Sequence, residues 1–254
     1  MKPTKGRLLQ AATRDGVSAR TVERDYAIAH VLARLGAHPG SDALVFKGGA
    51  CLRWLHFEDG RYSADIDCSV QGLTQAEALP MIDEALRAAP ASPTDLQLEL
   101  TDGEPPRIAY LGPLGKQRTL KLDLTDDEPV ESAARRPLNR RWADLPHVEV
   151  LAYTPLESAA EKLRCVLQRV QCRDLLDLHR LLDRVDPFEV VARFERKARH
   201  RGFDPTTFSE RYQARKQQYQ ARWESELSQY LGEVPSFRML ERELDRHLRH
   251  LGLL

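Results

Sequence analysis

The sequence predicts an α+β fold in which a mixed β-sheet with flanking helices is followed by an all-α domain. Short alternating apolar segments, typical of strands, recur through the first 153 residues. A strong helix start then follows at residues 154–157, with Thr as N-cap, Pro at N1 and Glu at N3. Helical periodicity continues from there almost to residue 254, so we expect two domains, residues 1–153 and 154–254.

The bulk composition favours an ordered globular protein. Of 254 residues, 42% are hydrophobic and 30% are charged. No apolar run approaches the roughly 20 residues of a membrane span, and the basic segment 1–7 is not followed by the apolar region of a signal peptide. The four cysteines form neither a C-x-x-C pair nor a zinc spacing, and Cys165 and Cys172 are spaced to share a helix face. These features predict a reduced, cytoplasmic setting without membrane partners.

The net charge of zero argues against a general nucleic-acid binder. Its distribution is less even, because residues 155–254 carry 19 basic and 16 acidic side chains. The second half is therefore mildly basic, although such a surplus is usually a solvated helix face.

The helices and strands of the first half are predicted from the periodicity of apolar residues and from capping and helix-ending residues. A helix is predicted from residue 21 to 35 with Gly36 as its stop, and another from Thr74, which forms a capping box with Glu77, to residue 88. A further helix starts at residues 50–55, directly after the first strand. The predicted strands cover residues 43–46, 61–70, 96–100, 108–111, 120–124 and 148–152.

The second half is predicted to contain helices only. Their expected ranges are 155–171, 173–184, 187–200, 205–231 and 236–251.

Three aspartates in the strand region suggest a metal site. Asp65 and Asp67 are spaced i, i+2, which places both on one face of a strand. Asp123 follows the alternation L-K-L-D-L, so it faces away from the leucines together with Lys121 and Thr125. Three acids on adjacent strands are able to hold two Mg²⁺ ions for phosphoryl transfer, and Asp123 is alternatively a base for an incoming hydroxyl. The competing interpretation is a set of solvent-facing acids.

The segment before these acids has features of a phosphate site. Gly48 and Gly49 open a helix directly after a strand, where backbone N–H groups are free to bind phosphate. Lys47, Arg61 and Ser63 lie close in sequence to the glycines and the acids. The competing interpretation is an ordinary tight turn with a surface lysine, and the motif of a P-loop is missing.

The helical half offers a second cluster of charges. Lys162 and Arg169 are seven residues apart and are expected on one helix face, while Asp174 and Asp177 are spaced i, i+3. One interpretation is a cationic wall for a triphosphate that the two acids orient. The other is a set of ion pairs within the chain.

These motifs, in this order, resemble the AbiEii/AbiGii nucleotidyltransferase toxin family, including MenT-type toxins. The upstream V-E-R-D-Y and the pattern of Trp223, Leu227 and Phe237 also fit. The motifs that carry the resemblance are F-K-G-G-x-x-L (46–52), R-x-S-x-D-I-D (61–67), L-K-L-D (120–123) and E-K-L-R with R-D-L-L-D-L (161–178).

The resemblance implies a DNA-polymerase-β-like nucleotidyltransferase core with an α-helical C-terminal domain. It further implies a toxin paired with a winged-helix-type antitoxin from a neighbouring gene, and some members of the family transfer nucleotides to the 3′ end of tRNA. Asp65 and Asp67 match the family's metal-binding pair, and Gly48 and Gly49 match its phosphate-binding pair. Lys162 and Asp174 match the later essential lysine and aspartate. The chain departs from the wider superfamily in having Gly-Gly where Gly-Ser is common, with a long gap to the acids.

The sequence therefore predicts a nucleotidyltransferase toxin that uses Mg²⁺, or alternatively Mn²⁺, to transfer a nucleoside monophosphate from an NTP to RNA, with the tRNA 3′ end as acceptor. The alternatives are transfer to an antibiotic or a protein hydroxyl, or a silent NTP-binding module. A phosphoryl group on Ser63 would place negative charge beside the acids and switch the enzyme off. The predicted catalytic residues are Asp65, Asp67, Asp123, Lys162 and Asp174, and the predicted nucleotide-binding residues are Lys47, Gly48, Gly49, Arg61, Ser63 and Arg169.

Overall fold

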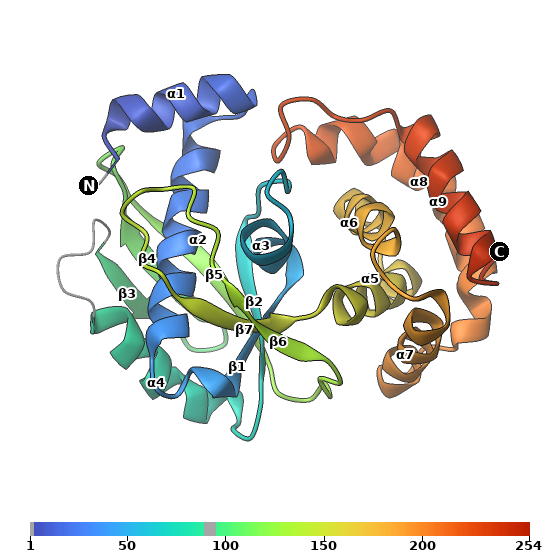
Figure 1. The fold of residues 1–254 in the computed structure, drawn as a ribbon, viewed down its shortest axis with the longest axis horizontal. Coiled ribbons are helices and arrows are strands. Elements are labelled where there is room, and N and C mark those ends of the chain that lie inside the picture. Colours follow the sequence, from blue (N-terminus) through green and yellow to red (C-terminus); the bar gives the residue numbers. More distant parts are fainter. Residues whose placement is uncertain (1–2, 89–94) are drawn as a thin grey trace. The chain divides into compact units, whose positions relative to one another are not determined.

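The computed structural model describes residues 3–88 and 95–254, and the chain divides into two compact units (Figure 1). The first unit contains Met1–Pro129 and Ala133–Tyr153. The second contains Thr154–Leu254 together with the short segment Val130–Ser132.

A mixed sheet forms the centre of the first unit. Among the described residues it has seven strands in the order β3-β4-β5-β2-β1-β7-β6. The pairs β2–β5 and β1–β7 are parallel, and the other neighbours are antiparallel. The predicted α+β class with a mixed sheet is therefore confirmed. The strands are β1 (Leu44–Lys47), β2 (Asp65–Val70), β3 (Leu96–Glu99), β4 (Arg107–Leu111), β5 (Gln117–Thr125), β6 (Ala133–Pro137) and β7 (Glu149–Tyr153).

Helices cover this sheet and supply the rest of its core. Helix α2 starts where Ser18 accepts a hydrogen bond from the backbone N–H of Thr21, and most of its side chains are buried. The predicted capping box of Thr74 and Glu77 begins α4. The helical elements of the first unit are α1 (Lys5–Asp15), α2 (Ala19–Ala37), η1 (Ser41–Ala43), α3 (Gly48–Cys51), η2 (Leu52–His56) and α4 (Gln75–Arg87).

The alternation in β5 fixes which way its side chains face. Leu120, Leu122 and Leu124 are buried in the core, whereas Lys121 and Asp123 lie on the other side, as predicted. Each buried leucine stabilises the fold by roughly 1.5–3 kcal/mol. A shift of the strand by one residue would expose all three leucines and bury the two charges, so the register is strongly determined.

The structure corrects several element boundaries in this unit. Residues 61–64 of the predicted strand 61–70 are not part of β2, and α2 continues past Gly36 to Ala37. Helix α1 and strand β6 were not predicted. Helix α1 buries only Leu8 and Ala12, and β6 is an exposed edge strand, so neither carries a clear apolar pattern.

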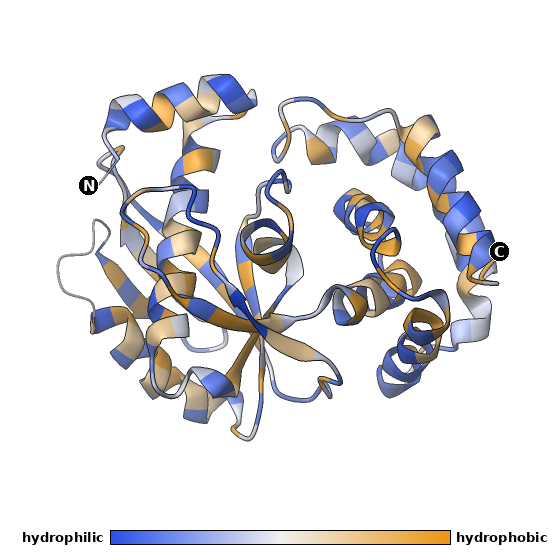
Figure 2. Ribbon diagram, viewed as in Figure 1, coloured by the Kyte–Doolittle hydropathy of each residue, from blue (hydrophilic) through white to orange (hydrophobic). Residues whose placement is uncertain are grey.

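The second unit contains helices only in its described residues after Tyr153. Thr154 accepts a hydrogen bond from the N–H of Glu157, which confirms the predicted helix start. Helices α8 and α9 carry many hydrophilic residues (Figure 2), and each buries one apolar stripe. No described helix has the length and apolar character needed to cross a membrane. The elements are α5 (Pro155–Gln168), α6 (Cys172–Leu182), α7 (Pro187–His200), η3 (Pro205–Thr207), α8 (Phe208–Leu227) and α9 (Phe237–His250).

Two predictions in this unit are wrong because α5 ends at Gln168. Arg169 is an extended cap with φ of −144°, so it does not share a helix face with Lys162. Cys165 and Cys172 lie on different helices, although both are buried and free. The expected helix 205–231 is divided into the turn η3 and the helix α8.

Candidate metal and nucleotide site

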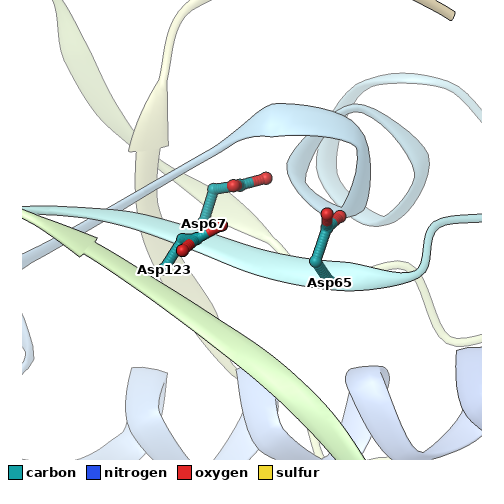
Figure 3. A group of neighbouring side chains, drawn as sticks. All are labelled: Asp65, Asp67 and Asp123. Carbon is teal, nitrogen blue, oxygen red and sulfur yellow. The ribbon is translucent and has the colours of Figure 1, made fainter. Parts of the chain in front are cut away.

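Three carboxylates converge on one side of the sheet in the first unit. Asp65 and Asp67 project from β2, and Asp123 projects from the neighbouring β5 (Figure 3). One carboxylate oxygen of each lies within 4.8 Å of the others. All three side chains are partly exposed. The predicted grouping of these acids on adjacent strands is thus present in the fold.

Strand pairing on both sides holds the central acid in place. Asp67 is opposite Asp123 in the parallel pair β2–β5 and opposite Lys47 in the antiparallel pair β1–β2. The intervening residues Ile66 and Cys68 are fully buried. Burial raises the pKa of the Cys68 thiol, and the negative charge of Asp67 raises it further. The thiol therefore stays protonated, and the site offers oxygen ligands.

The three carboxylates fit a hard divalent cation. Their donors are all oxygens, which Mg²⁺ and Mn²⁺ prefer. Three negative charges this close repel one another unless a cation lies among them. Part of that role falls to Lys121, whose Nζ lies 2.6 Å from Oδ2 of Asp123. The sequence placed Lys121 on the same face as Asp123, but this contact was not predicted.

Gly48 opens α3 directly after β1, as predicted, and its backbone is shaped by the acid beside it. Its φ of +70° lies in the left-handed region that side chains disfavour. A Cβ at this position would overlap the carboxylate of Asp67. Only glycine allows the start of α3 to approach Asp67 this closely.

Gly49 leaves room for two polar side chains. A Cβ there would lie 2.6 Å from Nη2 of Arg61 and 2.9 Å from Oγ of Ser63. Arg61 and Ser63 are both buried, and Arg61 donates a hydrogen bond to the carbonyl of Tyr62. Ser63 donates to Oδ1 of Asp65 at 3.3 Å. The predicted phosphate segment therefore packs directly against Asp65 and Asp67.

Lys47 is less accessible than the sequence suggested. It is buried, and its Nζ lies 3.2 Å from Oε2 of the buried Glu128 and 5.7 Å from the centre of the Tyr153 ring. Glu128 was not singled out in the sequence, because it follows β5 without any motif. A buried acid at this distance fixes the position of the ammonium group.

The remaining predicted residues form a separate cluster in the second unit. Nζ of Lys162 lies 2.8 Å from both Asp174 and Asp177, and Nε of Arg169 lies 2.9 Å from Asp174. Burial favours a higher pKa for Asp174, but Lys162 and Arg169 outweigh it and hold that pKa well below its usual range. The ion pairs of the second interpretation are present, and Asp174 stays ionised among them.

Comparisons with known proteins identify the family of the chain. The family described as "Nucleotidyl transferase AbiEii toxin, Type IV TA system" matches residues 30–248. A search of functionally curated proteins found no match.

Two solved structures were also compared. MenT4, a nucleotidyltransferase toxin from Mycobacterium tuberculosis H37Rv, aligns with a TM-score of 0.76 at 20% identity, covering 99% of this chain and 90% of that one. At this identity the likeness shows a shared fold. An antigenic nucleotidyltransferase-like protein from Paracoccidioides brasiliensis gives a TM-score of 0.46 at 18% identity, covering 74% of this chain and 92% of that one, a value too low to indicate a shared fold. On the family match, the chain belongs to the AbiEii family of nucleotidyltransferase toxins of type IV toxin–antitoxin systems.

Proposed function

We propose that the protein transfers a nucleoside monophosphate from an NTP to the 3′ hydroxyl of an RNA, with tRNA as the acceptor, and that it requires Mg²⁺. Membership of a nucleotidyltransferase toxin family supports the transfer of a nucleotide. The single observation that carries the metal requirement is the convergence of Asp65, Asp67 and Asp123. A cognate antitoxin is the expected protein partner, since the family belongs to toxin–antitoxin systems.

In this proposal Asp65, Asp67 and Asp123 hold the divalent metal. Bound Mg²⁺ supplies charge neutralisation and orientation of the phosphates. The acceptor hydroxyl attacks the α-phosphorus of the NTP, a new P–O bond forms, and the bond to the β-phosphate breaks with release of pyrophosphate. The hydroxyl proton passes to Asp123 or to water. Mn²⁺ is the alternative ion, because its preference for oxygen ligands is similar.

The chain's own groups then position the triphosphate. Gly48 and Gly49 provide close backbone approach, and Lys47 and Arg61 provide charge beside the acids. Ser63 orients Asp65 through its hydrogen bond. Positioning and charge stabilisation account for most of the catalysis in phosphoryl transfer.

Lys162, Arg169 and Asp174 are proposed to serve the same reaction from the second unit. Lys162 and Asp174 match the essential lysine and aspartate of the resembling family, and Arg169 shares Asp174 with Lys162. The paired acids keep Lys162 in one orientation, so its charge is preorganised for an anionic substrate.

The test is incubation of the protein with Mg²⁺, total tRNA and each α-labelled NTP in turn. We expect label in RNA with at least one NTP and its loss in Asp67→Ala. Absence of labelled RNA with all four NTPs contradicts the tRNA acceptor. Label appearing in protein or in an added aminoglycoside would instead identify the alternative acceptors. Wild-type activity in Asp67→Ala contradicts the metal assignment.

A further inference from the structure

A cavity of about 870 Å³ lies within the first unit and contains none of the three metal-binding aspartates. Its volume is in the range of roughly 300–1,000 Å³ that is typical of small-molecule sites. Its walls come from α1, α2, η2, the segment between η2 and β2, and the segment that follows β6. The residues used below that line it are Arg7, Gln10, Arg53, Tyr62, Arg141 and Trp142.

Part of the wall is fixed by buried polar contacts. Arg53 donates through Nε to Oδ1 of Asp25 at 2.7 Å, and its guanidinium lies 3.7 Å from the centre of the Tyr62 ring. The hydroxyl of Tyr62 donates to Asp15 at 2.6 Å, and Asp15 also pairs with Arg14 at 2.7 Å. The two aspartates of the wall are therefore neutralised by groups already present.

Once these pairs are set aside, the charged residues of the lining are Arg7, Arg141 and Glu58, which leave a formal net charge of +1. Neither Arg7 nor Arg141 forms an ion pair with any described residue, and the cavity's third acid is Glu58. The buried Nε of Arg141 has no hydrogen-bond partner among the described residues. Burial lowers the pKa of Arg141 and the neighbouring charge of Arg53 lowers it further, while Asp25, Tyr62 and Asp15 offset part of this effect. An anion with several acceptor oxygens would neutralise positive charge on Arg7 and Arg141 and would accept a hydrogen bond from Nε of Arg141. Phosphate is such an anion.

Other groups in the wall suit a nucleobase. Trp142 is half-buried and offers an aromatic ring, a group that stacks on bases in single-stranded RNA, whereas the Tyr62 ring is buried and covered by Arg53. Gln10 and Asn139 offer amides that both donate and accept hydrogen bonds. A cavity with arginines, one available aromatic ring and amides matches the parts of one nucleotide.

The cavity is also close to the proposed reaction centre in the same unit. Tyr62 and Asp65 are three residues apart, so their Cα atoms are separated by at most about 11 Å. The helix that starts with Gly48 beside Asp67 continues through α3 and η2 to Arg53 in the cavity wall. One polynucleotide strand is long enough to reach both places.

We infer that this cavity binds a nucleotide of the acceptor strand, with its phosphate on Arg7 and Arg141 and its base against Trp142. The inference rests on the proposed function, because it names where that acceptor is held. It assigns the NTP elsewhere, since the metal-binding acids do not line the cavity.

The test compares Arg7→Ala with Lys5→Ala, a matched exposed cation on the same helix that does not line the cavity. Binding of tRNA to the Asp67→Ala protein is measured by fluorescence anisotropy over a range of salt. We expect Arg7→Ala to weaken binding about tenfold and to reduce the salt slope by about 0.7, the value for one lost phosphate contact on a single strand. Arg141→Gln should act in the same direction, while Lys5→Ala should leave both quantities near those of the parent.

Steady-state transfer then separates the substrates. With an active protein, Arg7→Ala should raise KM for tRNA and leave KM for the NTP within about twofold. Equal effects of Arg7→Ala and Lys5→Ala on RNA binding overturn the inference, as does a rise confined to KM for the NTP. If the wild-type protein transfers nothing to RNA, the proposed function fails. The binding comparison still decides the cavity, because it needs no turnover.

Discussion

Asp67 on β2 is directly opposite Asp123 on the parallel strand β5, so two like charges are in register on the same side of the sheet. With Asp65 they form a group of three carboxylates whose oxygens lie within 4.8 Å of one another. Like charges this close repel one another, so we expect the group to destabilise the unit in the absence of a cation and to be stabilised when a cation is bound.

The first prediction follows from this repulsion. Asp67→Asn should unfold at a higher temperature than the wild type in EDTA, because one like charge is removed. In Mg²⁺ at about 100 times Kd the wild type should gain roughly 2.7 kcal/mol of stability, whereas the variant should gain much less. Thermal unfolding with and without Mg²⁺ measures both. Asp102→Asn, an exposed loop acid, serves as control. If Mg²⁺ stabilised Asp67→Asn as much as it stabilises Asp102→Asn, the assignment of Asp67 to a metal site would be contradicted.

The second prediction concerns Gly48→Ala. A Cβ at residue 48 would displace the Asp67 carboxylate, and a displacement near 1 Å is expected to lower kcat about 10²-fold. Gly115→Ala is the matched control, since Gly115 has a φ of +76° but open space around it. Both variants carry similar backbone strain, so Gly115→Ala shows how much of any loss of stability comes from that strain alone. Similar losses in the two variants would count against a role for the close approach.

The third prediction is that Lys121→Met binds a divalent metal more tightly than the wild type. The Lys121 ammonium forms an ion pair with Oδ2 of Asp123 and therefore competes with an incoming cation for this oxygen and repels it. Both side chains are more than one third exposed, so solvent screening limits the gain to roughly two- to fivefold in Kd. Titration with Mn²⁺, followed by its paramagnetic signal, measures the change. The control Lys116→Met, a lysine on the preceding exposed turn, should not alter Kd; weaker binding by Lys121→Met would show that the lysine supports the site.

The fourth prediction concerns the charge cluster of the second unit. Asp174→Asn should cost about 3 kcal/mol at pH 7, the low end for a broken buried pair, because Asp177 still contacts Lys162. The folded pKa of Asp174 is depressed, so its stabilising contribution is present above the unfolded value of 3.8 and is lost as pH falls through the folded pKa. The difference between wild type and variant should therefore shrink as pH falls below about 4.

Urea unfolding at pH values between 3 and 7 measures this difference. Glu195→Gln, which breaks the exposed pair with Arg199, should change stability little at any pH. A difference for Asp174→Asn that is independent of pH would show that ionisation of Asp174 is not the cause.

The fifth prediction concerns Ser63. Its side chain is buried and donates to Asp65. Ser63→Glu places a larger, negative side chain against the acids and should abolish transfer, as would a phosphoryl group there. Ser63→Ala loses a single hydrogen bond and should reduce kcat by no more than about tenfold. Full activity in Ser63→Glu would show that Ser63 has no part in the site.

Local patterns predicted the part of the site that depends on strand geometry. The leucines of β5 determined the side on which Asp123 lies, and the i, i+2 spacing placed Asp65 with Asp67. Contacts made by loops could not be predicted in this way. Glu128 reaches Lys47 across 81 residues, and neither position carries a periodic signal for the other.

The error at Arg169 has a different cause. Continuing the helical pattern past Gln168 assigned a helical position to a residue that caps α5 in extended conformation. The cap turns the Arg169 side chain onto Asp174, a partner that helical spacing does not predict. Element ends are set by a few capping contacts, so they are less predictable than the elements themselves.

The position of β2 in the sheet has a consequence for local opening of the fold. With β5 on one side and β1 on the other, β2 is the middle strand of the described seven, and its backbone is hydrogen bonded along both edges. Fraying that starts at β3 or β6 must cross several strands before it reaches Asp65 or Asp67. Amide protons of β2 should therefore exchange with solvent among the slowest of the molecule, so the ligand geometry persists through partial opening of the fold.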